Sequence, residues 1–282
     1  MADIAVQREV ARIDSPPIGR GMSELHRNRP LIPFGNWAFT DPFLVLMEDW
    51  FPKGVFDRHP HRGIETVTYV IQGGLEHYDN HGHKGAIAKG DAQWLTAGRG
   101  LIHNEYPNHG GVAHTLQLWI NLPAKDKLVR AHYQELQAAS LPTRHEPGAE
   151  IKVFSGSSGS VKAPTTNHVP VTMVQIDLSA NMSVDLDLPA RYNGFVLIME
   201  GEAEIGNART TLKAGQLAWL TRSEGASSVR VRGGDVATKG LLIAGLPLRE
   251  PVAAQGPFVM NTNAELREGF NEYRTQGDQF GL

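Results

Sequence analysis

The sequence predicts an all-β protein: two tandem β-barrels followed by a short C-terminal helix. Short segments rich in β-branched and aromatic residues recur at short, regular intervals, which is typical of a barrel or sandwich. Two parts of the 282-residue chain also resemble each other at a separation of about 125 residues. Near the C-terminus, apolar residues instead recur at helical spacing.

The strands of the first half are bounded by glycine, proline or asparagine turns. Residues 43–47 form a short apolar run, and residues 65–71 are rich in β-branched and aromatic types. Further strands are expected in four segments: 6–13, 75–78, 93–95 and 116–122. The pattern weakens between residues 124 and 145, so we place the domain boundary there and expect one or two helical turns within residues 127–138.

The second half is again rich in strand patterns. Strands are expected at residues 171–176, 183–188, 195–199, 203–205 and 216–220. The Gly/Ser run at residues 156–160 lacks the Gly-Lys-Ser/Thr ending of a phosphate-binding loop, so a surface turn is expected there. Thr262 and Glu265 have capping-box spacing. An amphipathic helix should follow them, with Leu266, Phe270 and Tyr273 on its apolar face.

The internal repeat is clearest around two tryptophans. The segment Gly90–Thr96 matches Gly215–Thr221 in its glycine, tryptophan, leucine and threonine. Residues 69–74 correspond in the same way to residues 197–201. Because Trp94 has a counterpart in Trp219, we expect both to be barrel-core residues, and the repeat to be a duplicated β-barrel.

Two pairs of polar residues stand out in the first half: His59 with His61, and His103 with Glu105. Residues i and i+2 of a strand point to the same face, so two such strands can direct three imidazoles and one carboxylate to one point. Burying these groups without partners would cost roughly 1–3 kcal/mol each, so a metal ion is the more economical explanation. Imidazole suits iron, copper, nickel and zinc, and a carboxylate adds a donor suited to iron and manganese.

The repeat predicts that the second barrel has no metal set. Projected by about 127 residues, His59 and His61 fall on Leu186 and Leu188, and by 125 residues, His103 and Glu105 fall on Ser228 and Arg230. Gaps can shift these positions by a residue or two. We therefore expect one metal per chain, a metal-binding domain at residues 1–135 and a related domain without metal at 136–282.

Several other polar residues have simpler explanations. His77, His81 and His83 are expected at an exposed hairpin tip rather than in a second metal site. His114 is expected on the surface or at the rim of a pocket, and Gln117 with Trp119 in core packing, with pocket lining as the alternative. Parity alone allows either Glu65 or Glu105 to face the metal site.

Composition excludes several classes of function. The net charge is −3 with neutral histidines, so no broad basic surface for nucleic acid is implied. The absence of cysteine excludes disulfides, thiolate metal sites and cysteine nucleophiles, and fits a reducing compartment. No stretch approaches the roughly 18 apolar residues that span a bilayer. A cytoplasmic protein that contacts neither nucleic acid nor membrane is expected.

The first half resembles a cupin, a jelly-roll barrel. Its segments Gly54…His59-x-His61-x-x-x-Glu65 and Gly90…Gly98…His103 are similar to the two cupin motifs. The chain as a whole resembles the pirin family of two-cupin proteins. The signatures that carry this resemblance are residues 59–66, 90–100, 116–123, 245–251 and 256–262.

The resemblance implies one divalent metal in the N-terminal cupin, usually iron as Fe(II), with Mn, Ni, Cu or Zn as alternatives. Its ligands would be His59, His61, His103 and Glu105, with Glu65 left in a structural role. It also implies an activity: opening of flavonols such as quercetin with O2, with Glu105 as a catalytic group. The alternative is a redox-sensitive regulator of a transcription factor or metabolic enzyme. A monomer is expected.

Overall fold

The computed structural model describes residues 6–282, which divide into two compact units. Unit 1 consists of the chain up to Pro16 together with Ala139–Pro247, and unit 2 consists of Pro17–Ala138 together with Leu248–Leu282. Each unit contains one seven-stranded sheet, one sheet of four or five strands and one two-stranded hairpin, so the all-β prediction is confirmed. These units are defined by contacts between residues. They differ from the expected domains 1–135 and 136–282, because the residues up to Pro16 belong to unit 1 and those from Leu248 onward to unit 2. The expected domain bounds stay a prediction.

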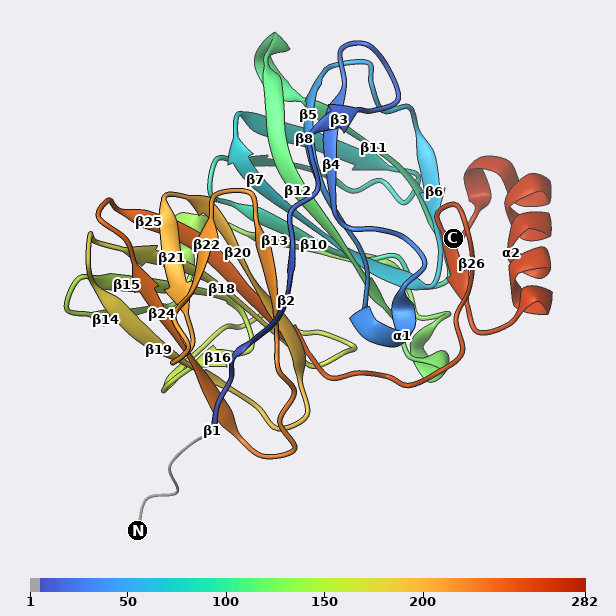
Figure 1. The fold of residues 1–282 in the computed structure, drawn as a ribbon. Helices are drawn as coiled ribbons and strands as arrows, with labels where there is room; N and C mark the ends of the chain where they lie inside the picture. The colour runs from blue at the N-terminus through green and yellow to red at the C-terminus, as the bar shows by residue number, and fades with distance from the viewer. Residues whose placement is uncertain (1–5) are drawn as a thin grey trace. The chain divides into compact units, whose positions relative to one another are not determined.

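Unit 2 contains a sheet in the order β13-β10-β7-β12-β5-β4-β3 and another in the order β6-β11-β8-β9 (Figure 1). Neighbouring strands in both sheets are antiparallel. The strands are β3 Gly19–Arg20, β4 Arg27–Ile32, β5 Phe43–Pro52, β6 His59–His61, β7 Ile64–Gln72, β8 Gly74–Asp79, β9 Lys84–Ala88, β10 Ala92–Thr96, β11 Leu101–Pro107, β12 Val112–Asn121 and β13 His132–Leu136. Short helical turns are α1 Trp37–Thr40, η1 Asn108–Gly110 and η2 Ala124–Asp126.

Unit 1 has a sheet in the order β14-β15-β18-β25-β20-β23-β2 and a smaller one in the order β1-β24-β21-β22, with β19 also paired to β24. The strands are β1 Val6–Gln7, β2 Val10–Asp14, β14 Thr143–Glu146, β15 Ala149–Ser155, β16 Ser157–Ser158, β17 Val161–Lys162, β18 Val171–Leu178, β19 Ser183–Leu188, β20 Asn193–Glu200, β21 Glu202–Ile205, β22 Thr210–Lys213, β23 Leu217–Leu220, β24 Ser227–Gly233 and β25 Thr238–Gly245. The turn η3 Ala138–Ser140 precedes β14.

The N-terminal strand β2 belongs to the later barrel. It pairs antiparallel with β23, from Val10 opposite Leu220 to Asp14 opposite Leu217. In unit 2, β13 pairs with β10 in the equivalent place, with Ala92 opposite Leu136. The edge strand beside β23 in unit 1 therefore comes from the start of the chain. The edge strand beside β10 in unit 2 is β13, which directly follows the other strands of that sheet in sequence.

The C-terminal segment forms a hairpin and a helix in unit 2. The hairpin strands are β26 Ala253–Gln255 and β27 Phe258–Met260, and they precede α2 Asn263–Gln276 and η4 Gly277–Gln279. The expected capping box at the start of α2 is present. Leu266, Phe270 and Tyr273 pack into a cluster that includes Phe258 and Phe280, so the predicted apolar face is confirmed.

The helical turns expected within residues 127–138 are not formed. Residues 132–136 form β13 instead, paired to β10 with Thr96 opposite His132. The helix prediction was wrong because hydrogen bonding to a neighbouring strand outweighs a weak local preference.

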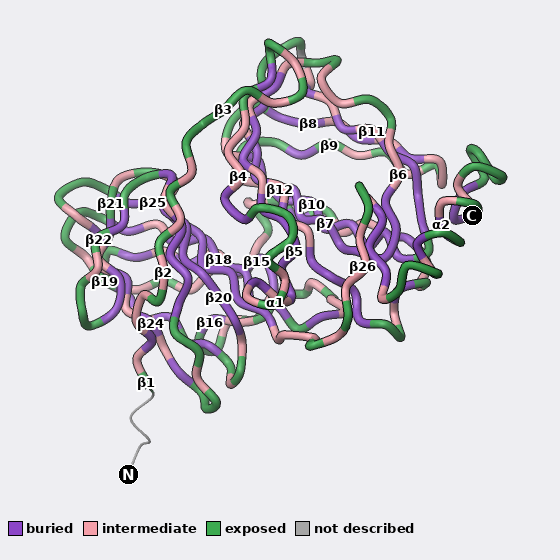
Figure 2. Tube along the Cα trace, turned by 45° about the vertical axis from the view of Figure 1, so that its right-hand side comes forward, coloured by how far each residue is buried: buried purple, intermediate pink, exposed green. Residues whose placement is uncertain are grey.

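Aliphatic side chains fill the interior of the barrel in unit 1. In unit 1 a single cluster of aliphatic side chains, including Leu186, Leu188 and Val229, occupies the space between the sheets. Buried residues run along β18 and β20 of that unit and along β7, β10 and β12 of unit 2 (Figure 2). Trp94 and Trp219 are both fully buried, as expected for core residues.

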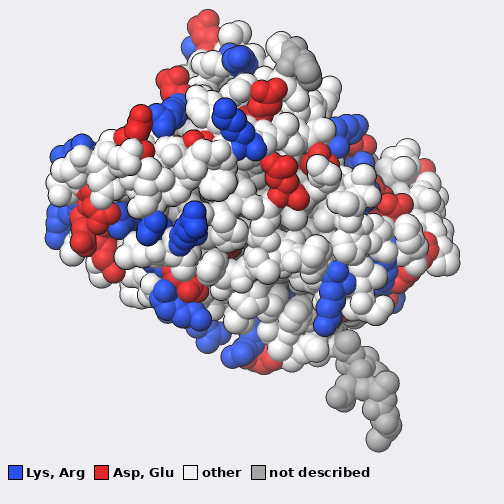
Figure 3. Space-filling view, turned by 180° about the vertical axis from the view of Figure 1, so that it is seen from behind, with Lys and Arg blue, Asp and Glu red and all other residues white. Residues whose placement is uncertain are grey.

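On the face shown in Figure 3, acidic and basic side chains are interspersed rather than separated by sign. Among the described residues, no helix is long and apolar enough to cross a membrane.

A buried lysine joins the C-terminal hairpin to the strands beside β6. The Lys127 ammonium donates hydrogen bonds to the Gly63 carbonyl at 2.8 Å, the Asn121 side-chain oxygen at 2.5 Å and the Val259 carbonyl at 2.9 Å. Gly63 has a φ of +77°, and a Cβ there would lie 2.0 Å from the Val259 oxygen. Only glycine allows the hairpin this close an approach.

Replacing Lys127 with Met should lower the free energy of unfolding by roughly 3 kcal/mol, because three buried oxygens lose their donor. Burial lowers the pKa of Lys127 from 10.5 to about 7. Between these pH values the unfolded chain holds a proton that the folded chain has released, so wild-type stability should rise with pH. Urea unfolding of both proteins at pH 6, where Lys127 of the folded chain carries its proton, measures the loss of the hydrogen bonds, and unfolding between pH 7 and 10 measures the pH dependence.

Lys125→Met is the matched control, because Lys125 is exposed two residues away. It should keep the wild-type stability and its rise with pH. An equal rise in Lys127→Met would show that other groups cause the pH dependence.

Candidate metal centre

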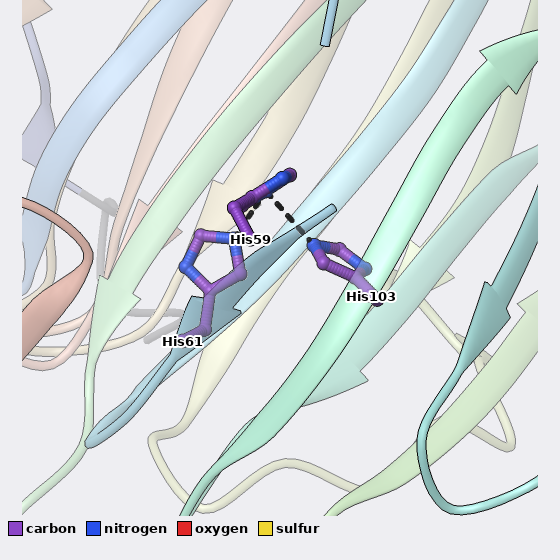
Figure 4. A group of neighbouring side chains, drawn as sticks. All are labelled: His59, His61 and His103. Carbon is purple, nitrogen blue, oxygen red and sulfur yellow. Dashed lines mark hydrogen bonds between the residues drawn. The ribbon is translucent and has the colours of Figure 1, made fainter. Parts of the chain in front are cut away.

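Three histidines of unit 2 converge on one point. His59 and His61 lie on β6, and His103 lies directly opposite His59 on β11. The Nε2 atom of His59 is 3.1 Å from Nε2 of His61 and 3.2 Å from Nε2 of His103. Figure 4 shows the three rings turned toward one another. In residues 6–282 they form the one group of three or more potential ligands whose donor atoms all lie within 4.8 Å of one another.

This arrangement fits a metal ion. Ligand nitrogens about 2.0–2.1 Å from a metal lie about 2.9–3.4 Å apart for right-angled to tetrahedral geometry. The Nδ1 atom of His59 donates to the Asp57 carbonyl at 2.8 Å, which leaves its Nε2 as a bare lone pair in the neutral ring. Bare nitrogens at these distances repel one another unless a cation lies between them.

Electrostatics keeps two of the rings neutral. Burial lowers the pKa of His61 and of His103 well below the ordinary value, and the neighbouring histidines lower each further. The Pro257 carbonyl near His61 opposes this shift. Neutral imidazole is the form that binds metals, so the site is prepared for a cation.

A tyrosine lies behind His103. The Tyr133 hydroxyl is 3.5 Å from Nδ1 of His103 and hydrogen-bonds the Asp79 carboxylate. Burial raises the pKa of Tyr133, so the hydroxyl keeps its proton and donates it to Asp79. Its oxygen can then accept the Nδ1 proton of His103, which leaves Nε2 free. Asp79 is fixed in turn by His83, whose Nδ1 lies 2.9 Å from it.

Glu105 lies near the triad but has protein partners of its own. One carboxylate oxygen accepts a hydrogen bond from Thr68 at 3.1 Å, and the other from the Gln117 amide at 2.8 Å. The Trp119 indole donates to the Gln117 oxygen at 3.2 Å, which orients that amide. Glu105 is outside the group of three imidazoles and lines the same cavity as His59, so its role as a ligand stays a prediction.

Glu65 has different surroundings. It is fully buried on β7 and accepts a hydrogen bond from the Thr96 hydroxyl at 2.8 Å. It is not among the residues that line the cavity, whereas Glu105 is. The geometry therefore favours Glu105 over Glu65 as the carboxylate of the site.

A cavity of about 670 Å³ opens beside the histidines. Its walls are mainly apolar and include Phe51, Phe56 and Trp119. Of the two expectations for Gln117 and Trp119, pocket lining is the one that holds for both, and Trp119 also packs against a core cluster. The sequence shows the alternating pattern of β12, but such a pattern does not indicate whether a strand face packs against other side chains or lines a cavity.

The expected hairpin tip is confirmed for His81 and His83, which lie partly exposed at the turn between β8 and β9, but it is wrong for His77. His77 is buried on β8, 3.2 Å from the Glu135 carboxylate, and its ring packs against that of Tyr133 at a tilt of 32°. His83 is partly exposed, and the three do not form a second group of ligands among the described residues. His114 is half-buried, 2.8 Å from Glu48, and outside the cavity lining.

The second barrel carries aliphatic side chains in the equivalent strands. β19 pairs with β24 as β6 pairs with β11, with Leu186 opposite Val229. The register therefore equates His103 with Val229 and Glu105 with Val231, one residue beyond the positions Ser228 and Arg230 that the sequence offset predicted. All these aliphatic residues are buried in the core of unit 1.

The fold and the site define a two-barrel cupin with one histidine cluster. Family models match both halves: "Pirin" over residues 31–120 and "Pirin C-terminal cupin domain" over residues 173–280. The chain belongs to the pirin family. The cupin fold and the family resemblance predicted from the sequence are thus confirmed.

Named relatives and solved structures agree with this assignment. "Pirin-1" of Arabidopsis thaliana is 38% identical, with 86% of this chain and 85% of that protein covered. GK1651 of Geobacillus kaustophilus is 46% identical with a TM-score of 0.86, covering 88% of this chain and all of that one. A quercetin 2,3-dioxygenase of Acinetobacter baumannii is 28% identical with a TM-score of 0.82, covering 98% of this chain and all of that one.

Tyr133→Phe should weaken metal binding roughly tenfold, because His103 loses the oxygen that accepts its Nδ1 proton. The measurement is competition between the protein and a chelator for Co(II), followed by the visible spectrum of the bound ion.

Tyr78→Phe is the control, because Tyr78 is a tyrosine on β8, in the sheet that holds His103, and packs against Tyr106. An unchanged affinity in Tyr133→Phe would show that the 3.5 Å contact does not orient His103.

Proposed function

We propose that this protein binds one iron ion per chain, as Fe(II), through His59, His61, His103 and Glu105, and opens flavonols such as quercetin with O2. The observation that carries the proposal is the convergence of three imidazole nitrogens at the wall of a largely apolar cavity. The similarity of this chain to a structure named quercetin 2,3-dioxygenase supports the choice of substrate.

The cavity suits a flat aromatic substrate. Its volume of about 670 Å³ falls in the ordinary range for small-molecule sites, and aromatic side chains line it. Trp119 packs edge-on against His61 with ring centroids 5.2 Å apart, so an apolar wall meets the histidines directly. These walls would exclude bulk water from the reacting part of a bound flavonol.

A divalent iron, when bound, would supply Lewis acidity toward a flavonol oxygen and a site for reaction with O2. The protein residues supply the proton chemistry. Glu105 would accept the proton of the substrate hydroxyl, at one of the oxygens that Thr68 and Gln117 hold in place. These two donors would keep the carboxylate facing the cavity while it accepts the proton.

Protein purified without added metal should contain one iron per chain and consume quercetin in air, releasing carbon monoxide. His103→Ala should lose both properties, because it removes one of the three converging nitrogens. Elemental analysis and gas detection measure the two outcomes.

His145→Ala controls for loss of a histidine, because His145 is exposed in the other unit. Equal quercetin turnover by His103→Ala and wild type would exclude this site. A metal-loaded wild type that releases no carbon monoxide would instead favour the regulatory alternative, whose signature is a protein partner that distinguishes ferrous from ferric protein.

Glu105→Gln keeps the shape of the side chain and removes its charge. We expect iron affinity to fall about tenfold, as for loss of a ligand or its support. At saturating iron, turnover should fall about 100-fold or more, as for loss of a general base. Measuring both separates the two roles: unchanged affinity would remove Glu105 from the ligand set, and unchanged turnover would remove it from the chemistry.

A further inference from the structure

A second carboxylate faces the cavity away from the histidines. Asp49 lies on β5, two residues from Met47 and two from Phe51, and all three line the cavity. Its exposed fraction is 7%. A nearly buried carboxylate in an apolar wall is unfavourable unless its oxygens have partners.

One oxygen of Asp49 has a fixed partner. Nε2 of His26 lies 2.8 Å from Oδ1 of Asp49, and the Met22 backbone N–H donates to Nδ1 of the same ring at 3.0 Å. Because Nδ1 accepts, the neutral ring carries its proton on Nε2 and donates it to Asp49. His26 is itself buried against Phe56, so this orientation is rigid.

The other oxygen has no such partner. Among the residues that the structure describes, His26 is the only side chain that hydrogen-bonds Asp49. Thr115, the cross-strand neighbour of Asp49 on β12, also lines the cavity. A polar pair is therefore presented to a ligand within otherwise apolar walls.

The strand register places this pair at a distance from the metal centre. Gln117, which holds Glu105, is opposite Met47, and Thr115 is opposite Asp49. One two-residue repeat of a strand spans about 7 Å. Asp49 thus lies about 7 Å along the cavity wall from the contact between Gln117 and Glu105. A fused aromatic ring system is long enough to span this distance.

Two explanations of Asp49 compete. In a purely structural role it would hold His26 and the loop at Met22, and asparagine would serve equally well. In a ligand-binding role its second oxygen would matter. Burial raises the pKa of Asp49 while His26 opposes the shift, and the nearby Glu48 and Glu105 raise it further. An arrangement with this electrostatic cost is more typical of a functional group than of a structural one.

We propose that Asp49 determines specificity: it accepts a hydrogen bond from a hydroxyl on the ring system of an aromatic ligand, remote from the oxygen that meets the metal. The ligand class is therefore polyhydroxylated aromatics, in preference to those with a single metal-directed hydroxyl. This inference rests on the proposed function for the orientation of the ligand. A ligand without this hydroxyl leaves Asp49 as a buried acceptor with no donor, and that ligand therefore binds more weakly.

The test compares two flavonols: quercetin, which carries hydroxyls on both outer ring systems, and 3-hydroxyflavone, which carries only the metal-directed one. Their dissociation constants are measured without oxygen on the metal-loaded protein by quenching of tryptophan fluorescence. Wild type should prefer quercetin, and Asp49→Asn should reduce that preference about tenfold. The asparagine oxygen still accepts from His26, while its amide replaces the acceptor that faces the cavity.

Glu48→Gln is the matched control, since Glu48 is the neighbouring carboxylate on the same strand but pairs with Arg29 and His114 outside the cavity. It should keep the wild-type preference. Asp49→Ser, which removes the second oxygen altogether, is the second variant if Asp49→Asn does not fold, and it should show the same loss.

The outcomes separate this inference from the proposed function. A wild type without preference for quercetin, or an Asp49 variant that keeps it, overturns the role of Asp49 even if carbon monoxide is released from either flavonol. Loss of the preference in the variant supports that role even if no flavonol is opened. Binding of neither flavonol to the wild type overturns it as well.

Discussion

The mutual approach of three imidazole nitrogens is the constraint on which the rest of unit 2 depends. It requires β6 to pair with β11 in one register, because a shift by one residue would turn His59 away from His103. The back of each ring must also be oriented, by the Asp57 carbonyl for one and the Tyr133 hydroxyl for another. The C-terminal hairpin adjoins β6 as well, because Phe258 of β27 forms a β-bridge with Arg62, the residue after His61.

The histidine pair at positions 59 and 61 could be recognised from sequence because strand geometry needs only a spacing of two residues. Its partner on β11 required the further assumption that the two strands meet, which the repeat and the family resemblance supplied. Tyr133 was missed for a specific reason: its segment was expected to be helical, and a residue on a wrongly assigned element has no predictable neighbours. Gln117 and Trp119 were placed on one face correctly, but a sequence pattern cannot distinguish a packed interior from a hollow one. Asp49 carries no motif, and its position follows only from the β5–β12 register.

The duplicated barrels show how little must change to create or remove a site. The strand pairs β6–β11 and β19–β24 have the same arrangement, and both barrels bury a tryptophan at matching positions. Leu186 and Val229 occupy the places of His59 and His103 and fill the interior by close packing. Aliphatic side chains stabilise one barrel from inside, whereas the other keeps polar groups and open space at its centre. The barrel of unit 1 is thus the closely packed copy of the scaffold, and the barrel of unit 2 is the copy that contains the three histidines.

The strand β2 has a consequence for the chain as a whole. It lies near the start of the chain, yet it pairs with β23 as an edge strand of the larger sheet of unit 1, while the last hairpin and helix belong to unit 2. Neither unit is therefore encoded by an unbroken stretch of sequence. The barrel of unit 1 has all its strands only once β25 has been made, although its strand β2 comes before every strand of unit 2. A protease cut between Ala138 and Ala139 would therefore leave β2 on the fragment that carries the strands of unit 2.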